Sequence, residues 1–390
     1  MAIYARKAFF ILPALLLLAA CTGRHRCHTP QERRKADSIV AQAQGIEALA
    51  KLQAQLEKQG NKLGSVVALR EWGKALRDES RFEESLRVHS KGLKQAEAMG
   101  DTIEWVLALN YIGTNYRRLG VLDAAQTYHY QALRLTEESG DTCWLARKNY
   151  VKSLNGLGNI YMTLGNFKRA DSVLRKALEG EHQLGSDIGQ AINCANLGSV
   201  ANHMGKKDSA WAYYHRSMAS NRHANNKLGI ALCHTAFGEM YQEAKEYDKA
   251  YTEYQTAYEQ LHDSKDEWHA LNSLIALADI YHTTGNDAKE MEYLGKAKAI
   301  AERIKSPEHL AEIHTLYYKH YKRTGDYRTS LSSYEQATVL QDSVLNMEKV
   351  NRIQNTSLNI ERNRQAREMG EARHRLEQER TARYVGFGVL

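Results

Sequence analysis

The stretch LNGLGNIYMTLGNFKRADSVLRKAL, residues 154–178, contains the clearest copy of a pattern that recurs along this chain. Within it, Tyr161 follows Gly158 by three residues and Gly165 follows Gly158 by seven. A second clear copy, FGEMYQEAKEYDKAYTEYQTAY, covers residues 237–258. The apolar residues recur with helical spacing on both sides of a turn, so each copy predicts two amphipathic helices that reverse direction.

The pattern returns at a nearly fixed interval. Its reference position is occupied, in order, by Gly73, Gly113, Gly158, Gly198, Gly238, Ala278 and Tyr318. These positions lie 40, 45, 40, 40, 40 and 40 residues apart. A fixed period of this size predicts supersecondary units that stack side by side and bury their apolar faces against one another.

Other positions recur in the same register. Tyrosines often follow the reference position by three residues and glycines by seven, at the turn. The residue twelve positions after it is small in six of seven units, which allows close helix packing, and Glu290 is the exception. The small residues are Ser85, Ala125, Ala170, Ala210, Ala250 and Ser330.

This spacing resembles the tetratricopeptide repeat. The resemblance covers residues 62–340 and implies an all-α fold, a right-handed α-solenoid of about seven helix pairs. The 40-residue period is longer than the family's, and the family's closing proline is missing, since the only prolines are Pro13, Pro30 and Pro307. We expect longer helices to absorb the difference. The five extra residues before Gly158 should extend the first helix of unit three by more than one turn.

The resemblance also implies a ligand groove lined by the first helix of each unit. Transferred residue by residue, the family's contact positions predict a groove formed by Arg70, Lys74, Arg77, Asn110, Arg117, Arg118, Asn155, Asn159, Asn196 and Asn202. Four of the asparagines resemble the ladder by which peptide-binding members hold a ligand main chain: Asn110, Asn155, Asn159 and Asn196. The alternative is that these amides satisfy neighbouring helix ends or water.

The predicted groove changes sign along its length. Units one and two are basic, units five and six carry Glu239, Glu243 and Asp279, and unit seven is basic again. We therefore expect a ligand that is acidic where it meets Arg117 and Arg118.

Composition excludes several classes of function. The net charge of +7 is modest and the basic residues do not cluster with aromatic ones, so nucleic-acid binding has little support. The sequence contains no HExxH, no zinc-spaced Cys/His cluster, no phosphate loop and no GxSxG. We expect the protein to have no enzymatic activity and to bind no cofactor and no metal ion. Cys194 and Cys233 should be buried, and a disulfide between Cys27 and Cys143 stays open for an oxidising compartment.

The N-terminal residues predict export. Residues 1–20 read as a signal peptide, and Leu18-Ala19-Ala20-Cys21 resembles a bacterial lipobox, which implies lipidation at Cys21. The alternative is an ordinary signal peptide that ends at a cysteine. Residues 21–61 are then a tether and an N-terminal capping helix, and the protein is expected in the cell envelope, anchored to a membrane and facing the periplasm.

The C-terminal residues predict one long helix. Residues 341–383 are polar helix formers with a fragmentary apolar stripe, typical of a spacer or of a weak coiled coil that forms a dimer. Residues 384–390 turn apolar, and the start of a transmembrane helix is one interpretation.

Three functions fit these observations. The first is a non-enzymatic protein- or peptide-binding module of the bacterial envelope, the sensory part of a membrane-anchored signalling regulator. The second is a free-standing lipoprotein scaffold for envelope assembly. The third is a glycan-binding lipoprotein, which ranks last because ten of the 22 tyrosines occupy repeat core positions.

Overall fold

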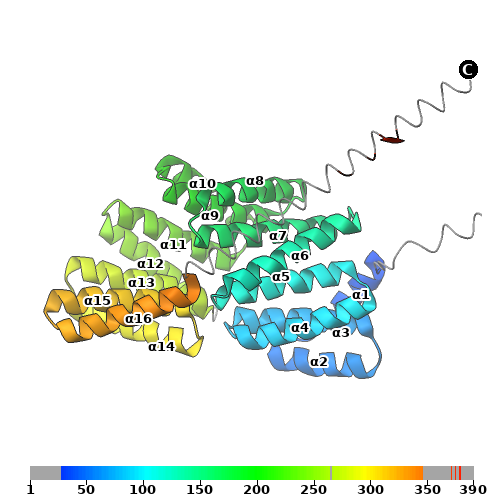
Figure 1. The fold of residues 1–390 in the computed structure, drawn as a ribbon, viewed down its shortest axis with the longest axis horizontal. Helices are drawn as coiled ribbons and strands as arrows, with labels where there is room; N and C mark the ends of the chain where they lie inside the picture. The colour runs from blue at the N-terminus through cyan, green and yellow to red at the C-terminus, as the bar shows by residue number, and fades with distance from the viewer. Residues whose placement is uncertain (1–27, 264–265, 346–369, 371–373, 375–376, 379–390) are drawn as a thin grey trace, which may run out of the picture.

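The computed structural model describes residues 28–263, 266–345, 370, 374, 377 and 378 (Figure 1). In these residues the chain forms helices and no strands. The helices are α1 Pro30–Val40, α2 Ile46–Lys58, α3 Lys62–Asp78, α4 Phe82–Met99, α5 Thr102–Arg118, α6 Leu122–Ser139, α7 Trp144–Thr163, α8 Phe167–Gln183, α9 Asp187–His203, α10 Lys207–His223, α11 Lys227–Glu243, α12 Tyr247–Asp263, α13 Glu267–Thr284, α14 Asp287–Arg303, α15 Pro307–Thr324 and α16 Tyr327–Leu345.

Seven consecutive pairs, from α3/α4 to α15/α16, form units one to seven. The two helices of each unit pack together, and each second helix packs against the first helix of the next unit. The first helices of neighbouring units also contact one another, so they form a continuous inner layer. The expected all-α solenoid of helix pairs is confirmed.

Several expectations fall outside the described residues. They are the signal peptide over 1–20, lipidation of Cys21, most of the long helix over 341–383, and the apolar end at 384–390. Across the described helices, none combines the length and the apolar character that crossing a bilayer requires.

Close packing explains the glycines at the reference position. A Cβ added to Gly198 would lie 2.6 Å from the ring of Tyr214, and one added to Gly238 would lie 2.7 Å from Tyr254. In each unit the contact comes from the residue sixteen positions later, on the second helix. In unit seven the reference position is Tyr318; its ring lies 5.3 Å from that of Tyr334, which is 52% exposed. The loss of glycine therefore goes with an exposed side chain at the matching position of the second helix.

The turn glycines adopt the left-handed conformation that the sequence predicts. Gly120, Gly165, Gly205, Gly285 and Gly325 all have φ between 69° and 86°. In unit one the same position is Ser80, with φ of 58°. A residue with a Cβ in this conformation is strained, and the hydroxyl of Ser80 has a long-range partner that is described below.

The prediction for unit three needs a correction. Helix α7 has 20 residues, against 17 in α5, so it is longer by three residues rather than by more than one turn. The other two extra residues lengthen the loop before it, residues 140–143. Cys143 ends this loop as the N-cap of α7, and its thiol accepts a hydrogen bond from the Ala146 amide at 3.4 Å. Cys27 lies outside the described residues, so a disulfide to Cys143 stays a prediction. Cys194 and Cys233 are buried, as expected.

Glu290 is buried where the other units have a small residue. His282 and His320 approach its two carboxylate oxygens at 2.8 and 2.9 Å, and Arg323 donates to it at 2.7 Å. Ligand atoms of Asp287, Glu290 and His320 lie within 4.8 Å of one another, which is compatible with a metal ion. Arg323 also pairs with Asp287 at 2.7 Å. A guanidinium already neutralises both carboxylates, so the cluster reads as a structural network.

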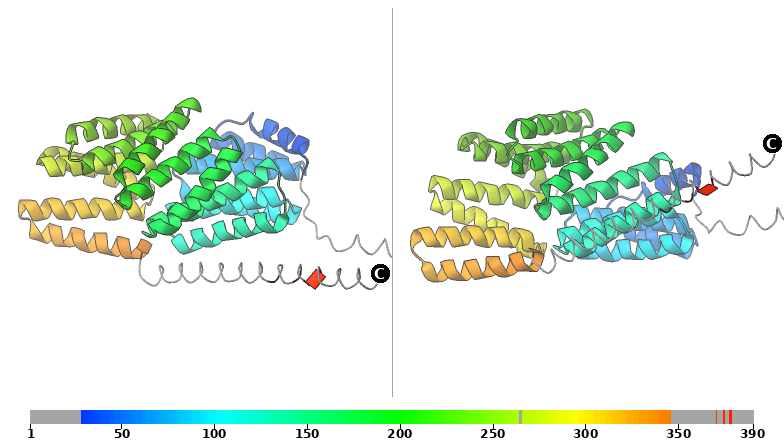
Figure 2. Two further views of the ribbon diagram at one scale, coloured as in Figure 1. Left: turned by 90° about the horizontal axis from the view of Figure 1, so that it is seen from above. Right: turned by 45° about the horizontal axis from the view of Figure 1, so that its top comes forward.

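The solenoid curls until its two halves touch (Figures 1 and 2). The amide of Trp268, in unit six, donates to the hydroxyl of Ser80, in unit one, at 3.2 Å. Lys305 pairs with Glu83 at 3.0 Å, and Phe82 belongs to the same buried cluster as Trp268. We call this contact the seam; it joins units one and two to unit six and to the turn after unit six. Because of the seam, the layer of first helices closes on itself, and we call the space that its inner surface faces the channel.

Candidate functional site

The inner surface of the channel is the candidate site. Along each first helix, residues ten, six and three positions before the reference position, and one, four and five after it, lie on one side. These positions include every residue of the predicted groove except Asn196, which stands two positions before its reference residue. They also include residues that the family pattern does not cover, because the helices here are longer.

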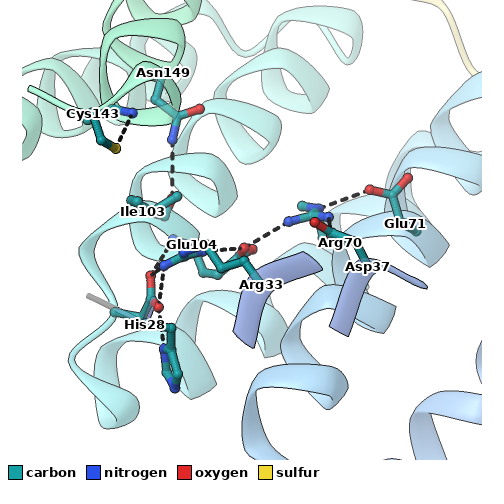
Figure 3. A network of polar contacts seen from close by, with 11 residues as sticks. His28, Arg33, Asp37, Arg70, Glu71, Ile103, Glu104, Cys143 and Asn149 are labelled. Carbon is teal, nitrogen blue, oxygen red and sulfur yellow. Dashed lines mark hydrogen bonds and ion pairs between the residues drawn. The ribbon is translucent and has the colours of Figure 1, made fainter. Parts of the chain in front are cut away.

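At its N-terminal end the inner surface is covered by α1. Ala36 and Val40 of α1 share a buried cluster with Leu63 and Val67 of α3. Arg33 donates to Asp101 at 2.5 Å and to Glu104 at 3.0 Å, both in the first turn of unit two (Figure 3). An intramolecular helix therefore occupies this end of the groove.

Arg70 belongs to the same network. Its guanidinium contacts Glu104 at 2.8 Å, Asp37 at 2.6 Å and Glu71 at 2.9 Å (Figure 3). Burial raises the pKa of Glu104, and the guanidiniums of Arg70 and Arg33 oppose that rise. Arg70 holds α1 in place rather than presenting a free charge.

Lys74 and Arg77 lie further along unit one. Lys74 is exposed and pairs weakly with Glu71 at 3.6 Å. Arg77 bonds Asp78 at 2.8 Å and stands 5.3 Å from the centre of the Tyr111 ring. Both cations can be reached from the channel.

Asn110 is not available to a ligand. It is 4% exposed; its amide nitrogen donates to Ser153 at 3.0 Å, and its oxygen lies 2.9 Å from Nδ1 of His129. Burial lowers the pKa of His129 to about 3, so the ring is neutral. The Asn110 amide therefore forms hydrogen bonds with side chains of the neighbouring helices.

Three predicted asparagines form one network in units three and four. Asn155 donates to Asn193 at 3.1 Å and accepts from Asn159 at 2.9 Å and from Asn196 at 3.4 Å. Asn155, Asn159 and Asn196 are half-buried, and Asn193 is fully buried. The sequence analysis missed Asn193, which orients the others from the core. The structure brings this set together on the channel wall.

Asn202 is buried and bonded on both sides. It donates to Glu243 at 2.8 Å and accepts from Lys207 at 2.7 Å, and Lys207 also pairs with Glu243. These three residues link units four and five.

Arg117 and Arg118 lie at the seam. The Arg118 guanidinium stacks 3.4 Å from the centre of the Trp268 ring and contacts Nε2 of His269 at 3.0 Å. Arg117 lies 5.6 Å from the same ring. Within the described part of the chain their contacts are with rings rather than carboxylates, and Nη1 of Arg118 is buried without a partner. Burial lowers the pKa of both side chains. We call Arg117 and Arg118 the basic pair.

The channel wall formed by units five to seven holds an acidic groove. A cavity of about 540 Å³ is lined by inner-surface residues of units five, six and seven. They include Glu239, Gln242, Asn272, Asp279, Glu312 and Lys319. Desolvation by the surrounding channel wall raises the pKa of Glu239 to about 7. The same desolvation, together with the carboxylates of Glu308 and Glu239, raises the pKa of Glu312 to about 7.

Both carboxylates of the acidic groove reach the solvent in the channel, since Glu239 and Glu312 are exposed. Sequence reasoning found Glu239 and Asp279 but missed Glu312 and Asn272. Both missed residues stand six positions before the reference position, outside the family's contact positions. The long 40-residue unit was the signal that would have found them.

Apolar residues are open on the inner surface of units four and five. Ile188 and Ile192 are 46% and 47% exposed, and Leu228 is 38% exposed. In unit one the matching positions are Leu63 and Val67, which α1 covers. The middle of the channel therefore offers apolar contact between the asparagine network and the acidic groove.

Together these features define an α-solenoid of helix pairs with an enclosed, chemically varied inner channel. A family profile described as tetratricopeptide repeat matches residues 151–179. No curated protein sequence matches the chain. The matched segment and the solenoid fold are those of tetratricopeptide repeats, and such repeats form protein-interaction modules.

Solved structures with the same fold share little sequence with this chain. A Rap protein complexed with competence and sporulation factor is 15% identical, with a TM-score of 0.59, over 76% of this chain and 80% of that one. The Rap conjugation gene regulator of plasmid pLS20, in complex with the Phr* peptide, is 14% identical, with a TM-score of 0.60, over 74% and 76%. The Cut9–Hcn1 hetero-tetramer is 16% identical, with a TM-score of 0.50, over 70% and 47%.

Proposed function

We propose that this protein binds a peptide or an extended protein segment in its inner channel, as the sensory part of a membrane-anchored signalling regulator of the bacterial envelope. The observation that carries the proposal is the acidic groove, where Glu239, Asp279 and Glu312 line one cavity of about 540 Å³. A cavity of this size holds a few side chains of a ligand rather than a folded domain.

The channel walls favour a ligand of mixed charge. The acidic groove suits a lysine or arginine of the ligand, and the basic pair, Arg117 and Arg118, suits a carboxylate. The asparagine network offers amide groups to a main chain between them. This extends the sequence prediction, which placed only the acidic end of the ligand.

Two of the structurally similar proteins support a peptide as the ligand class. One is complexed with competence and sporulation factor and the other with the Phr* peptide. For the present chain, the envelope location rests on the lipobox-like Leu18-Ala19-Ala20-Cys21. A free-standing lipoprotein scaffold remains the second candidate, and it predicts a folded partner in place of a peptide.

A peptide selection tests the proposal. A displayed library of random peptides is panned against the purified protein, and the affinity of enriched synthetic peptides is measured by calorimetry. We expect enriched peptides to contain Lys or Arg together with Asp or Glu. The double variant Glu239→Gln, Glu312→Gln should weaken their binding at least about tenfold, because it removes two of the three carboxylates of the acidic groove and leaves only Asp279.

A matched control keeps the result specific. Glu259 and Glu292 are exposed on second helices, outside the channel, and Glu259→Gln, Glu292→Gln should leave affinity unchanged. Equal losses in the two double variants, or a library that yields no enriched peptide, would contradict the proposal.

The pH dependence gives an independent check. Carboxylates with a pKa of about 7 lose their charge as the pH falls through 7. Binding of a basic peptide should therefore weaken from pH 8 to pH 6 in the wild type. It should weaken less in the Glu239→Gln, Glu312→Gln variant, which carries no titrating group at these positions.

A further inference from the structure

The last helix of the solenoid has an uncovered apolar face. On α16, Tyr327 is 72% exposed, Leu331 is 59% exposed, Tyr334 is 52% exposed and Val339 is 69% exposed. Leu331 and Val339 share one side of the helix with Arg328, Glu335 and Asp342, since these residues follow one another by three or four positions. Tyr334 lies nearer the buried side, with its ring 5.3 Å from that of Tyr318. The opposite side, with Ser330, Ser333 and Ala337, is buried. We call the uncovered side the end face.

Part of the end face corresponds to the surface through which the second helix of each earlier unit packs against the next unit. Thirteen positions after the reference position, Trp211 packs on Phe237 and Tyr241 of the next unit, and Tyr251 packs on Tyr281. In unit seven this position is Leu331. Nine positions after the reference position, Phe167 stacks on His203 of the next unit, and Tyr327 is its counterpart. Leu331 and Tyr327 are stacking residues without a following unit in the described structure.

The two ends of the solenoid differ. At the N-terminal end, α1 and α2 cover unit one, with Ala36, Val40 and Leu49 in the buried cluster. At the C-terminal end the chain continues past α16 with residues 346–369, a stretch that contains no glycine and no proline. Within the described residues, unit seven therefore has no counterpart of the helices that cover unit one.

The end face is complementary to itself. Leu331 and Val339 stand four residues on either side of Glu335, and Arg328 and Asp342 stand seven on either side. Two antiparallel copies of α16 that cross at Glu335 would place Leu331 against Val339 and Arg328 against Asp342. Such a two-fold contact uses the same patch on both copies.

We propose that the end face binds a second copy of this chain, through an antiparallel α16 pair centred on Glu335. The pairing extends the stacking used between units and covers apolar residues that are otherwise left in water. Glu335 lies on the two-fold axis, where it faces its own copy, so the pair should tighten when that charge is removed.

Sedimentation velocity on the full chain over a concentration series tests the proposal. We expect a monomer–dimer equilibrium that Leu331→Asp and Val339→Asp each weaken at least about tenfold and that Glu335→Gln tightens. Arg328→Asp should weaken the dimer, and the double variant Arg328→Asp, Asp342→Arg should restore it. The control is Val121→Asp, an exposed valine at the turn before α6, which should change nothing.

Circular dichroism confirms that each variant is folded before it is compared. A chain that stays monomeric at every concentration would overturn the proposal, because the end face would then be covered in cis or not at all. A dimer that survives both Leu331→Asp and Val339→Asp would overturn it as well, since the contact would lie elsewhere. Failure of the charge swap to restore the dimer would reject the antiparallel register.

Discussion

The reference glycines set how closely the two helices of a unit approach. Across the first five units, the residue sixteen positions later lies where a Cβ would be. That residue is His89, His129, Leu174, Tyr214 or Tyr254, so one small residue accommodates side chains of different shape. Close packing of the two helices thus explains why glycine recurs in the sequence. Substitutions at single residues can test this explanation.

Gly198→Ala should destabilise the protein by about 1–2 kcal/mol. The new methyl group would lie 2.6 Å from the buried Tyr214 ring, and this clash outweighs the helix propensity gained over glycine. Urea unfolding measures the change. The control is Gly295→Ala on α14, where a Cβ meets nothing within 4 Å, and it should raise stability by up to about 1 kcal/mol. A neutral Gly198→Ala would show that the helices separate easily.

His89 should make the protein sensitive to acid. Burial lowers the pKa of His89 from 6.5 to about 3, so below about pH 6.5 the unfolded chain takes up a proton that the folded chain does not. Folding stability is therefore lost as the pH falls, by up to about 1.4 kcal/mol per pH unit for this residue.

The variant His89→Leu isolates that effect, because leucine fills the same position as Leu174 in unit three and Leu294 in unit six. Urea unfolding of both proteins at pH 8 and pH 5 gives the comparison. We expect the variant to lose less stability than the wild type between the two pH values. An identical loss would mean that His89 is protonated in the folded state.

At single positions, the sequence predicted the helices and turns better than it predicted the contacts of the site residues. The register identified helices, turns and the burial of Cys194 and Cys233. It could not show that Asn110 bonds His129 or that Arg70 bonds α1, because those partners depend on how far neighbouring helices rotate and on a helix outside the repeat. Ligand binding by the groove residues stays a prediction.

Helix α1 shows how an element outside the repeat changes the groove. Its side chains cover Leu63 and Val67, and its Arg33 lies between two buried carboxylates, Asp101 and Glu104. The sequence predicted a capping helix before residue 62. A polar network of residues 33, 37, 70, 101 and 104 fixes α1 on the inner surface. These residues are far apart in the sequence, so no local sequence pattern could show that they interact.

Arg33→Ala should release α1. The substitution leaves the Asp101 carboxylate, which is fully buried, with fewer cationic partners, and losing one partner of such a pair costs about 3 kcal/mol. Hydrogen exchange should show faster exchange across Pro30–Val40 and the first turn of α5, while units four to seven keep wild-type protection. Arg34→Ala, on the exposed side of α1, is the control. Unchanged exchange in α1 would show that apolar contacts alone hold it.

For the whole molecule, the seam decides the shape of the site. The repeat pattern predicted a stack of helix pairs with a concave face but carried no information on how far the stack curls. Curvature accumulates from small rotations between units, and the contact is then fixed by individual residues, Ser80, Arg118 and Trp268. The strained φ of Ser80 fits this role, since serine supplies the hydroxyl that glycine lacks.

Closure of the solenoid at the seam is the property on which the channel depends. Spin labels at Glu83→Cys and Lys305→Cys report on it directly, because the side chains of these residues pair at 3.0 Å across the seam. Cys21, Cys27 and Cys143 are replaced by serine, and Cys194 and Cys233 are too buried to be labelled. Electron–electron double resonance then gives the distance distribution. A closed seam gives one narrow distribution at short distance, whereas a long, broad distribution would show that the seam is open.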